Sequence, residues 1–220
     1  MNASSNPGLD RLISNLDRLW SDEQDQTQLA NTIHELDARY DLGRKIVDEP
    51  GVEDVIQQMF GRLVIVFGKL SSIQGKKILD IACGSNTSKA PESLHIHTPF
   101  GKKTIARTNN GYTAQFEPWF CRILFELGAE VVGIDFGDLD HELFTHYRVD
   151  LGQIGALNFL PDQSFDAIQD SRLFGSPEFT AQFPDKADRL KIAQEIRRQE
   201  QRLLKANGIV IHSDADALLR

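Results

Sequence analysis

The chain has 220 residues, of which 40% are hydrophobic and 25% charged, and this is the composition of an ordinary globular protein. Its net charge is −8, and most of the excess lies in residues 1–60, which hold twelve acidic and five basic side chains. We expect no nucleic-acid partner, because an acidic surface repels the phosphate backbone. We also expect no membrane association, because no apolar run approaches the roughly 20 residues of a membrane helix.

The N-terminus is polar and lacks a basic region followed by an apolar one, so a secretory signal is not expected. Cys83 and Cys121 are too few for a disulfide framework and have no metal-binding spacing. These features favour a reduced, cytoplasmic protein. His95 and His97 would share one face of a strand, but no third ligand lies near them in the sequence, so we expect no metal site.

Apolar residues at helical spacing predict helices over residues 9–20, 22–40 and 52–70. Beyond them, predicted strands alternate with predicted helices. The strands cover 77–82, 130–135, 146–150, 165–169 and 209–212, and the helices cover 117–127 and 185–206. Strands that alternate with helices form a parallel sheet with crossover connections. The sequence therefore predicts an α/β fold with a mostly parallel sheet.

Two domains are expected, a helical cap over residues 1–73 and a main domain over residues 74–220. Within the main domain, residues 85–117 form an insertion far longer than an ordinary strand–helix loop. Its alternating side chains and the Asn110-Gly111 pair predict a β-hairpin or flap, which we expect to cover the binding cleft. The chain ends soon after the last predicted strand.

The most informative segment is the first predicted strand and the turn that follows it. The strand ends at Asp80, and small residues follow at alternate positions, namely Ala82, Gly84 and Asn86. Small residues let backbone N–H groups approach a ligand at the carboxyl end of a parallel strand. Asn86 is the least usual of the three, but Asn tolerates a left-handed backbone better than other non-glycine residues. The second strand ends at Asp135, whose carboxylate can accept hydrogen bonds from both hydroxyls of a ribose.

Three further segments follow in order: Asp150-Leu151 after the third strand, Leu160–Ile168 leading into the fourth, and Leu203–Val210 leading into the fifth. Across about residues 74–213, this series resembles the motifs of the class I S-adenosylmethionine-dependent methyltransferases. The resemblance implies a Rossmann-like, doubly wound sheet, S-adenosylmethionine as cofactor and enzymatic activity. The sequence departs from the family pattern in keeping only Gly84 of the three usual glycines.

The resemblance also implies which residues form the site. The cofactor-binding candidates are Asp80, Ala82, Cys83, Gly84, Asp135, Phe136, Asp150 and Leu151, with Asp150 and Leu151 at the adenine. Arg107 or Arg122 could hold the methionine carboxylate, because Arg binds carboxylates bidentately, and Arg122 is preferred for its position at a helix start. Asp170, after the fourth strand, is the candidate catalytic base, although a capping role or a cofactor contact is equally open.

The predicted function is methyl transfer from S-adenosylmethionine to a small-molecule acceptor, with no metal. The acceptor and the oligomeric state are not specified. Two alternatives remain open: a non-catalytic cofactor-binding or scaffold protein of this fold, and a protein or RNA methyltransferase that recruits its target through the acidic N-terminal helices. A nicotinamide dinucleotide site is disfavoured, because Ala82-x-Gly84-x-x-Thr87 does not match the glycine pattern of such sites.

Overall fold

A computed structural model describes residues 7–49, 51–86, 93–98, 101–106, 113–171 and 173–219, with the backbone alone for 93–98, 101–106, 177 and 178. The helices are α1 (Pro7–Asp17), α2 (Glu23–Tyr40), α3 (Leu42–Asp48), α4 (Gly51–Phe67), α5 (Trp119–Glu126), α6 (Pro177–Gln182), α7 (Lys186–Leu203) and α8 (Asp214–Leu219), with short 3₁₀ turns η1 (Leu70–Ile73) and η2 (Ala114–Phe116). The strands are β1 (Lys77–Ile81), β2 (Ser93–Thr98), β3 (Gly101–Ala106), β4 (Glu130–Asp135), β5 (Thr145–Arg148), β6 (Phe165–Asp170) and β7 (Leu204–Ser213).

The central sheet has five strands in the order β5-β4-β1-β6-β7, and all neighbouring pairs are parallel. Counted among themselves, these strands have the order 3-2-1-4-5, which is the order of a Rossmann-like sheet. The predicted α/β, doubly wound fold is therefore confirmed. The chain reverses direction across the sheet between β1 and β6, and ligands of such folds bind at the carboxyl ends of the strands at this point.

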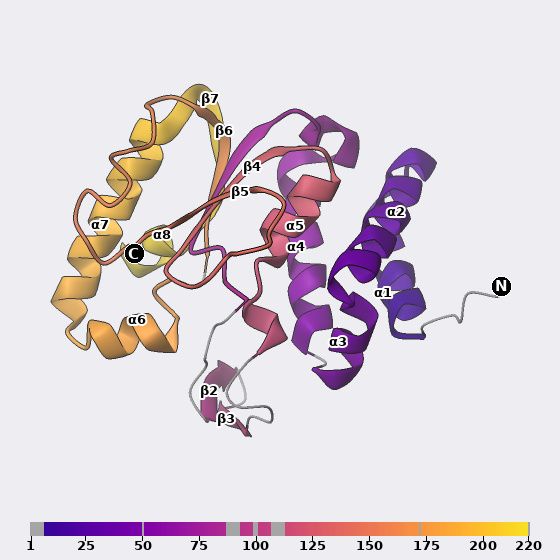
Figure 1. Cartoon of the computed structure of the whole chain (residues 1–220), viewed down its shortest axis with the longest axis horizontal. Coiled ribbons are helices and arrows are strands. Elements are labelled where there is room, and N and C mark those ends of the chain that lie inside the picture. Colours follow the sequence, from indigo (N-terminus) through magenta and orange to yellow (C-terminus); the bar gives the residue numbers. More distant parts are fainter. Residues whose placement is uncertain are drawn as a thin grey trace.

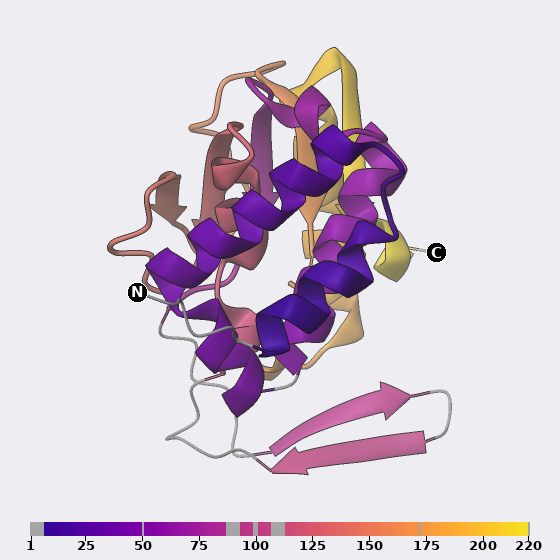
Figure 2. The same ribbon diagram turned by 90° about the vertical axis from the view of Figure 1, so that its right-hand side faces the viewer.

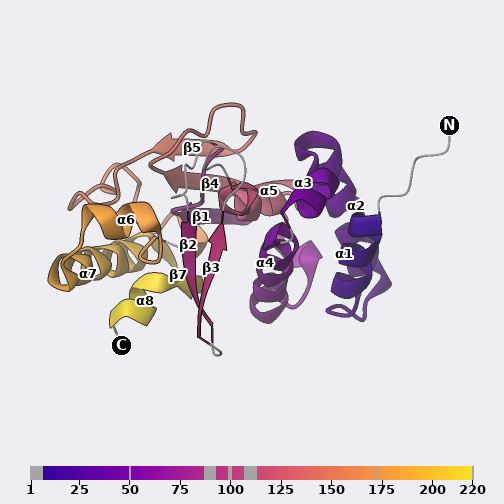
Figure 3. The same ribbon diagram turned by 90° about the horizontal axis from the view of Figure 1, so that it is seen from below.

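Helices cover both faces of the sheet, as Figure 1 shows. Alternate residues of β1 point to opposite faces, so Ile78 belongs to one core and Leu79 to the other. The first core joins the sheet to α1–α5, and the second joins it to α6–α8. The N-terminal helices share this first core with α5 and the sheet, and Figure 3 shows them beside the sheet rather than over its carboxyl edge. The proposed domain boundary at residue 73 stays a prediction.

Most predicted elements are present within a few residues of their expected bounds, and three helices were missed. Helix α3 begins directly after Asp41, a residue in left-handed conformation that ends α2. Helix α6 begins at a Ser176-Pro177 pair, in which the Ser176 hydroxyl caps the backbone N–H of Phe179. Helix α8 follows β7 without a break. Within the described ranges, no helix combines the length and apolarity needed to cross a membrane.

The insertion contains a β-hairpin, as predicted, but the expected turn was wrong: the strand pairing closes between Thr98 and Gly101, and the Asn110-Gly111 pair comes after the second strand. Strands β2 and β3 pair antiparallel from Ser93–Ala106 to Thr98–Gly101, and they project from the body of the protein (Figure 2). They lie at the same end of the molecule as the carboxyl ends of the central strands. The Asn110-Gly111 pair, Arg107 and the side chains of His95 and His97 lie outside the described residues.

Candidate functional site

A cavity of about 500 Å³ lies at the carboxyl edge of the sheet, at the position where the strand order reverses. Its volume is in the range of about 300–1,000 Å³ that small-molecule sites occupy. The lining residues are Met59, Asp80, Ala82, Cys83, Gly84, Ser85, Phe116, Glu117, Asp135, Phe136, Gly137, Asp138, Arg148, Val149, Asp150, Leu151, Gly152, Ser171, Leu173, Ser176, Phe179 and Gln182. All eight cofactor-binding candidates from the strand ends are among them, so tertiary structure brings these separate motifs to one cavity.

The turn after β1 obtains its shape from two residues with positive φ, Ala82 at 59° and Gly84 at 95°. A Cβ atom at Gly84 would lie 2.2 Å from the carbonyl oxygen of Phe116, so no side chain fits there. The backbone N–H of Ser85 donates to the same carbonyl at 2.9 Å. Asn86, the third small residue of the turn, does not have a positive φ. Close packing of the turn against η2 accounts for the glycine.

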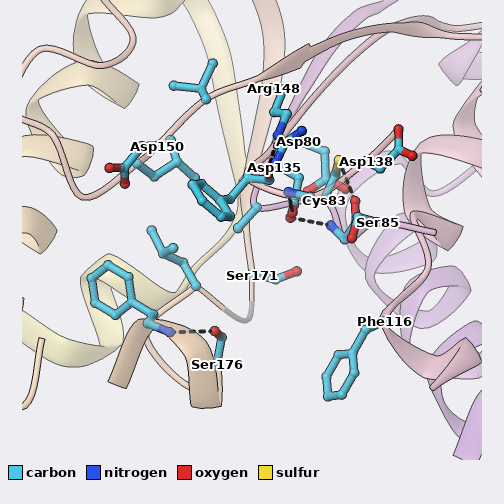
Figure 4. Close-up of a pocket in the computed structure, with 18 of the residues that line it drawn as sticks. Asp80, Cys83, Ser85, Phe116, Asp135, Asp138, Arg148, Asp150, Ser171 and Ser176 are labelled. Atoms are coloured by element: carbon cyan, nitrogen blue, oxygen red, sulfur yellow. Dashed lines mark hydrogen bonds between the residues drawn. The ribbon is translucent and has the colours of Figure 1, made fainter. Parts of the chain in front are cut away.

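The carboxylate of Asp135, at the end of β4, accepts hydrogen bonds from two loops of the cavity wall, the turn after β1 and the loop after β4. Its Oδ2 accepts the N–H of Gly84 at 3.0 Å, and its Oδ1 accepts the N–H of Gly137 at 2.8 Å. Figure 4 shows the carboxylate between these loops, at the cavity wall. Each carboxylate oxygen can accept more than one hydrogen bond.

The next strand end contributes a second carboxylate and apolar surface. Asp150 accepts the N–H of Gly152 at 2.9 Å through Oδ1 and the Nε2 of Gln153 at 3.0 Å through Oδ2. Leu151 is buried, whereas Phe136 is 64% exposed, with the Arg148 guanidinium 5.7 Å from the centre of its ring. An apolar wall with a carboxylate at its rim suits a flat heteroaromatic ring that carries an amino group.

Asp80 is 1% exposed, and its Oδ1 has no hydrogen-bond partner among the described residues. Its Oδ2 accepts from the Cys121 thiol at 3.5 Å. Burial raises the pKa of Asp80 to about 7, so this carboxyl group is close to half protonated at neutral pH. Burial also raises the pKa of the Cys83 thiol to about 11, which excludes a thiolate nucleophile there at neutral pH.

The structure does not bring Arg122 into the cavity. The side chain is 3% exposed and donates to both carboxylate oxygens of Glu142, to the carboxylate of Glu117 and to Oδ1 of Asn86. Its guanidinium therefore binds carboxylates of the protein itself, in the bidentate geometry predicted for a cofactor carboxylate. Arg107, the alternative, lies outside the described residues.

Asp170 is also outside the cavity. The side chain is fully buried, and its Oδ2 accepts the N–H of Ala215 at 2.8 Å and the hydroxyl of Ser213 at 3.3 Å. Burial raises the pKa of Asp170 well above its ordinary value. This residue joins the start of α8 to the sheet, and it cannot reach a substrate as a catalytic base. The alternation of side chains along a strand explains the difference, since the adjacent Ser171 lines the cavity instead.

Sequence reasoning missed the wall opposite the two loops. Leu173, Ser176, Phe179 and Gln182 line it from α6 and the segment before it, and Ser171 lies beside them (Figure 4). The Ser-Pro pair that begins α6 was a usable signal for this helix. Among the described residues, no group of three or more His, Cys, Asp or Glu is arranged to hold a metal ion.

No family profile matches the chain, and no curated protein matches it. Two solved structures show a distant similarity. The first, the trans-methyltransferase CalH in complex with SAH, is 11% identical, with a TM-score of 0.38 over 96% of this chain and 56% of that one. The second, the CurJ carbon methyltransferase, is 13% identical, with a TM-score of 0.35 over 93% of this chain and 47% of that one. The chain thus spans about half the length of each of these two proteins.

Proposed function

We propose that this protein binds S-adenosylmethionine in the cavity and transfers its methyl group to a small-molecule acceptor. The observation that carries the proposal is the convergence at one cavity of Asp80, the Ala82–Gly84 turn, Asp135 and Asp150-Leu151. In this assignment Asp135 accepts the ribose hydroxyls, and Asp150 with Leu151 holds the adenine. The cofactor supplies a methyl group already activated on a sulfonium, so the protein has mainly to align the reactants and exclude water.

The charges around the cavity support a cationic ligand. Its described lining includes the carboxylates of Asp135, Asp138 and Asp150 against the single guanidinium of Arg148. Two more lining carboxyl groups add less negative charge, because Glu117 pairs with Arg122 and Lys45 and burial raises the pKa of Asp80 to about 7. S-adenosylmethionine has a net positive charge, from the sulfonium and ammonium groups less one carboxylate. A dinucleotide has two phosphates, which such a lining would repel. A dinucleotide turn also opens directly into a helix, whereas α5 begins only at Trp119, after the insertion.

A small-molecule acceptor is proposed from the wall opposite the loops. That wall offers apolar side chains and the hydroxyls of Ser171 and Ser176, and it carries no described charged group. The Ser171 side chain is 5% exposed and points into the cavity, where its oxygen accepts only a long hydrogen bond of 3.4 Å from Gln169 among the described residues. Its O–H can therefore donate to an acceptor molecule.

Calorimetric titration tests the proposal. We expect wild-type protein to bind S-adenosylmethionine and S-adenosylhomocysteine but not NAD, and Asp135→Ala to weaken binding about 10- to 100-fold, the equivalent of a lost hydrogen bond to a charged group. Asp188→Ala removes an exposed acid of α7 and serves as the matched control with unchanged affinity. Binding of NAD in preference to the adenosyl ligands, or no adenosyl binding at all, would overturn the assignment. Methyl transfer to a panel of small molecules then separates an enzyme from a non-catalytic binder.

A further inference from the structure

The two loops that carry the cofactor candidates lie directly against each other. Besides the bonds to Asp135, the backbone N–H of Cys83 donates to the carbonyl of Ile134, and that of Asn86 donates to the carbonyl of Asp138, both at 3.0 Å. A Cβ atom at Gly137 would lie 2.1 Å from the Ser85 hydroxyl oxygen, so the loops are in close contact. The relative position of the glycine turn and the Asp135 carboxylate therefore depends on this loop–loop contact.

Arg122 of α5 holds the two loops together from behind the cavity. Its guanidinium donates to Oδ1 of Asn86, in the first loop, at 2.8 Å. It also donates to both oxygens of Glu142, in the second loop, at 2.6 and 3.1 Å. Asn86 itself donates through Nδ2 to Glu142 at 3.0 Å, which closes the arrangement. One planar guanidinium thus bridges both loops, which only an Arg side chain can do.

The surroundings of Arg122 fix its orientation. The guanidinium lies over the ring of Tyr40 at 3.9 Å and near that of Trp119 at 4.7 Å. Its other partner, the Glu117 carboxylate, lines the cavity and also accepts from Lys45 of α3 at 2.6 Å. We call Arg122, Asn86, Glu142, Glu117 and Lys45 the Arg122 cluster. Its two cations and two carboxylates balance, so its buried charges are paired.

We propose that Arg122 and Asn86 are positioning residues that keep the two loops in their cofactor-binding arrangement, an inference that rests on the proposed function. Neither residue needs to touch the ligand. If the loops adopt the binding arrangement only part of the time, the apparent dissociation constant rises in inverse proportion to that fraction. The Asn in the place of a family glycine then has a physical role, because its side chain supplies contacts that a glycine lacks.

The sharpest test is Asn86→Ala, which removes the bridge while leaving the Arg122 ion pairs with Glu142 and Glu117 in place. We expect S-adenosylhomocysteine binding at 25 °C to weaken about tenfold, as the binding-competent fraction falls. Asn158→Ala is the matched control, since Asn158 also joins a loop to a helix, through its Oδ1 and Gln199 at 2.7 Å, but lies outside the cavity lining. Its affinity should equal that of the wild type.

Arg122→Lys is the second variant. Lys keeps the positive charge but cannot bridge Asn86 and Glu142 with one planar group. Affinity should fall as in Asn86→Ala. Hydrogen exchange of the ligand-free protein gives a local readout, in which the amides of Gly84, Gly137 and position 86 exchange faster in both variants and those of α7 do not. A purely structural role would instead lower the melting temperature without changing affinity or these amides.

Each outcome decides something. Tenfold weaker binding with faster loop exchange supports the positioning role. Unchanged affinity in both variants, beside a wild type that binds, overturns it. If wild-type protein binds neither adenosyl ligand, the proposed function fails. In that case, unchanged hydrogen exchange of the loop amides in both variants overturns the positioning role as well. Faster exchange of these amides would instead show that Arg122 and Asn86 hold the two loops together.

Discussion

The two sides of the cavity are built differently. On the loop side, the turn after β1 and the loop after β4 are held by the Asp135 carboxylate and by the Arg122 cluster. With the loop after β5, this side contributes all five carboxyl groups of the described lining. On the helix side, α6 and the segment before it present Leu173, Ser176, Phe179 and Gln182, with no charged group among the described lining residues. Charged groups held in fixed positions select a ligand with a complementary charge pattern, whereas a neutral wall does not select its ligand by charge. The difference agrees with the proposed arrangement, in which the cofactor lies on the loop side and the acceptor on the helix side.

The largest effect should come from removing the cation of the loop side. Arg122→Met leaves Glu117 and Glu142 buried without their guanidinium, and breaking a buried ion pair in this way costs about 3–5 kcal/mol. Urea denaturation measures the change in unfolding free energy. Arg44→Met removes an exposed ion pair with Asp41 and should change little. Equal unfolding free energies of the two variants would show that the Arg122 cluster does not stabilise the loop side.

Gly84→Ala is expected to have the next largest effect, because the new Cβ meets the Phe116 carbonyl and the backbone has a positive φ. Strain of this kind costs about 1–3 kcal/mol. Gly61→Ala is the control, and it should raise the unfolding free energy. Gly61 lies within α4 with nothing near its Cβ position, and Ala in place of Gly stabilises a helix by about 0.5–1 kcal/mol. Thermal unfolding of both variants checks the prediction. A stable Gly84→Ala protein would mean that the turn does not need to pack against η2.

The pH dependence of stability should reveal Asp80. Its pKa is about 7 in the folded protein because of burial, against an ordinary value of 3.8. Between these values the folded state holds a proton that the unfolded state has released, so unfolding free energy falls as pH rises, by up to about 1.4 kcal/mol per pH unit. Asp170 and Glu200, whose pKa values burial also raises, act in the same direction. The difference between wild type and Asp80→Asn isolates Asp80.

Asp80→Asn should therefore be more stable than wild type near pH 7 and show a shallower slope between pH 4 and 7. Chemical denaturation at a series of pH values measures both. A slope identical to that of the wild type would mean that Asp80 is ionised in the folded protein throughout this range.

The smallest effect is expected on the helix side. Ser176→Ala removes the cap of α6, where the hydroxyl accepts the N–H of Phe179 at 3.0 Å, and should cost about 1 kcal/mol. Affinity for S-adenosylhomocysteine should stay at the wild-type value, because the cofactor candidates all belong to other elements. A large loss of cofactor affinity in Ser176→Ala would contradict the division of the cavity into two sides.

The sheet strands were predictable because their apolar runs and turn residues are local. The same holds for the cofactor candidates Asp80, Gly84, Asp135 and Asp150, since each lies at or just beyond a strand end and parallel strands bring such ends to one edge. The binding role predicted for Arg122 and the catalytic role predicted for Asp170 rested only on their positions at a helix start and a strand end, and the structure places both outside the cavity lining. Which way a side chain points at the end of an element depends on what packs against it, and the sequence does not contain that information locally.

The sequence by itself determined a parallel α/β sheet, the order of its strand-end motifs and the residue types found at the strand ends. Tertiary structure alone decided that Ser171 rather than Asp170 faces the cavity, that Gly84 is required by the Phe116 carbonyl, and that Arg122 joins two loops. The physical reason is distance along the chain. Backbone patterns depend on neighbouring residues, whereas the Arg122 cluster joins side chains from Lys45 to Glu142, whose contact exists only after the helices and loops have packed.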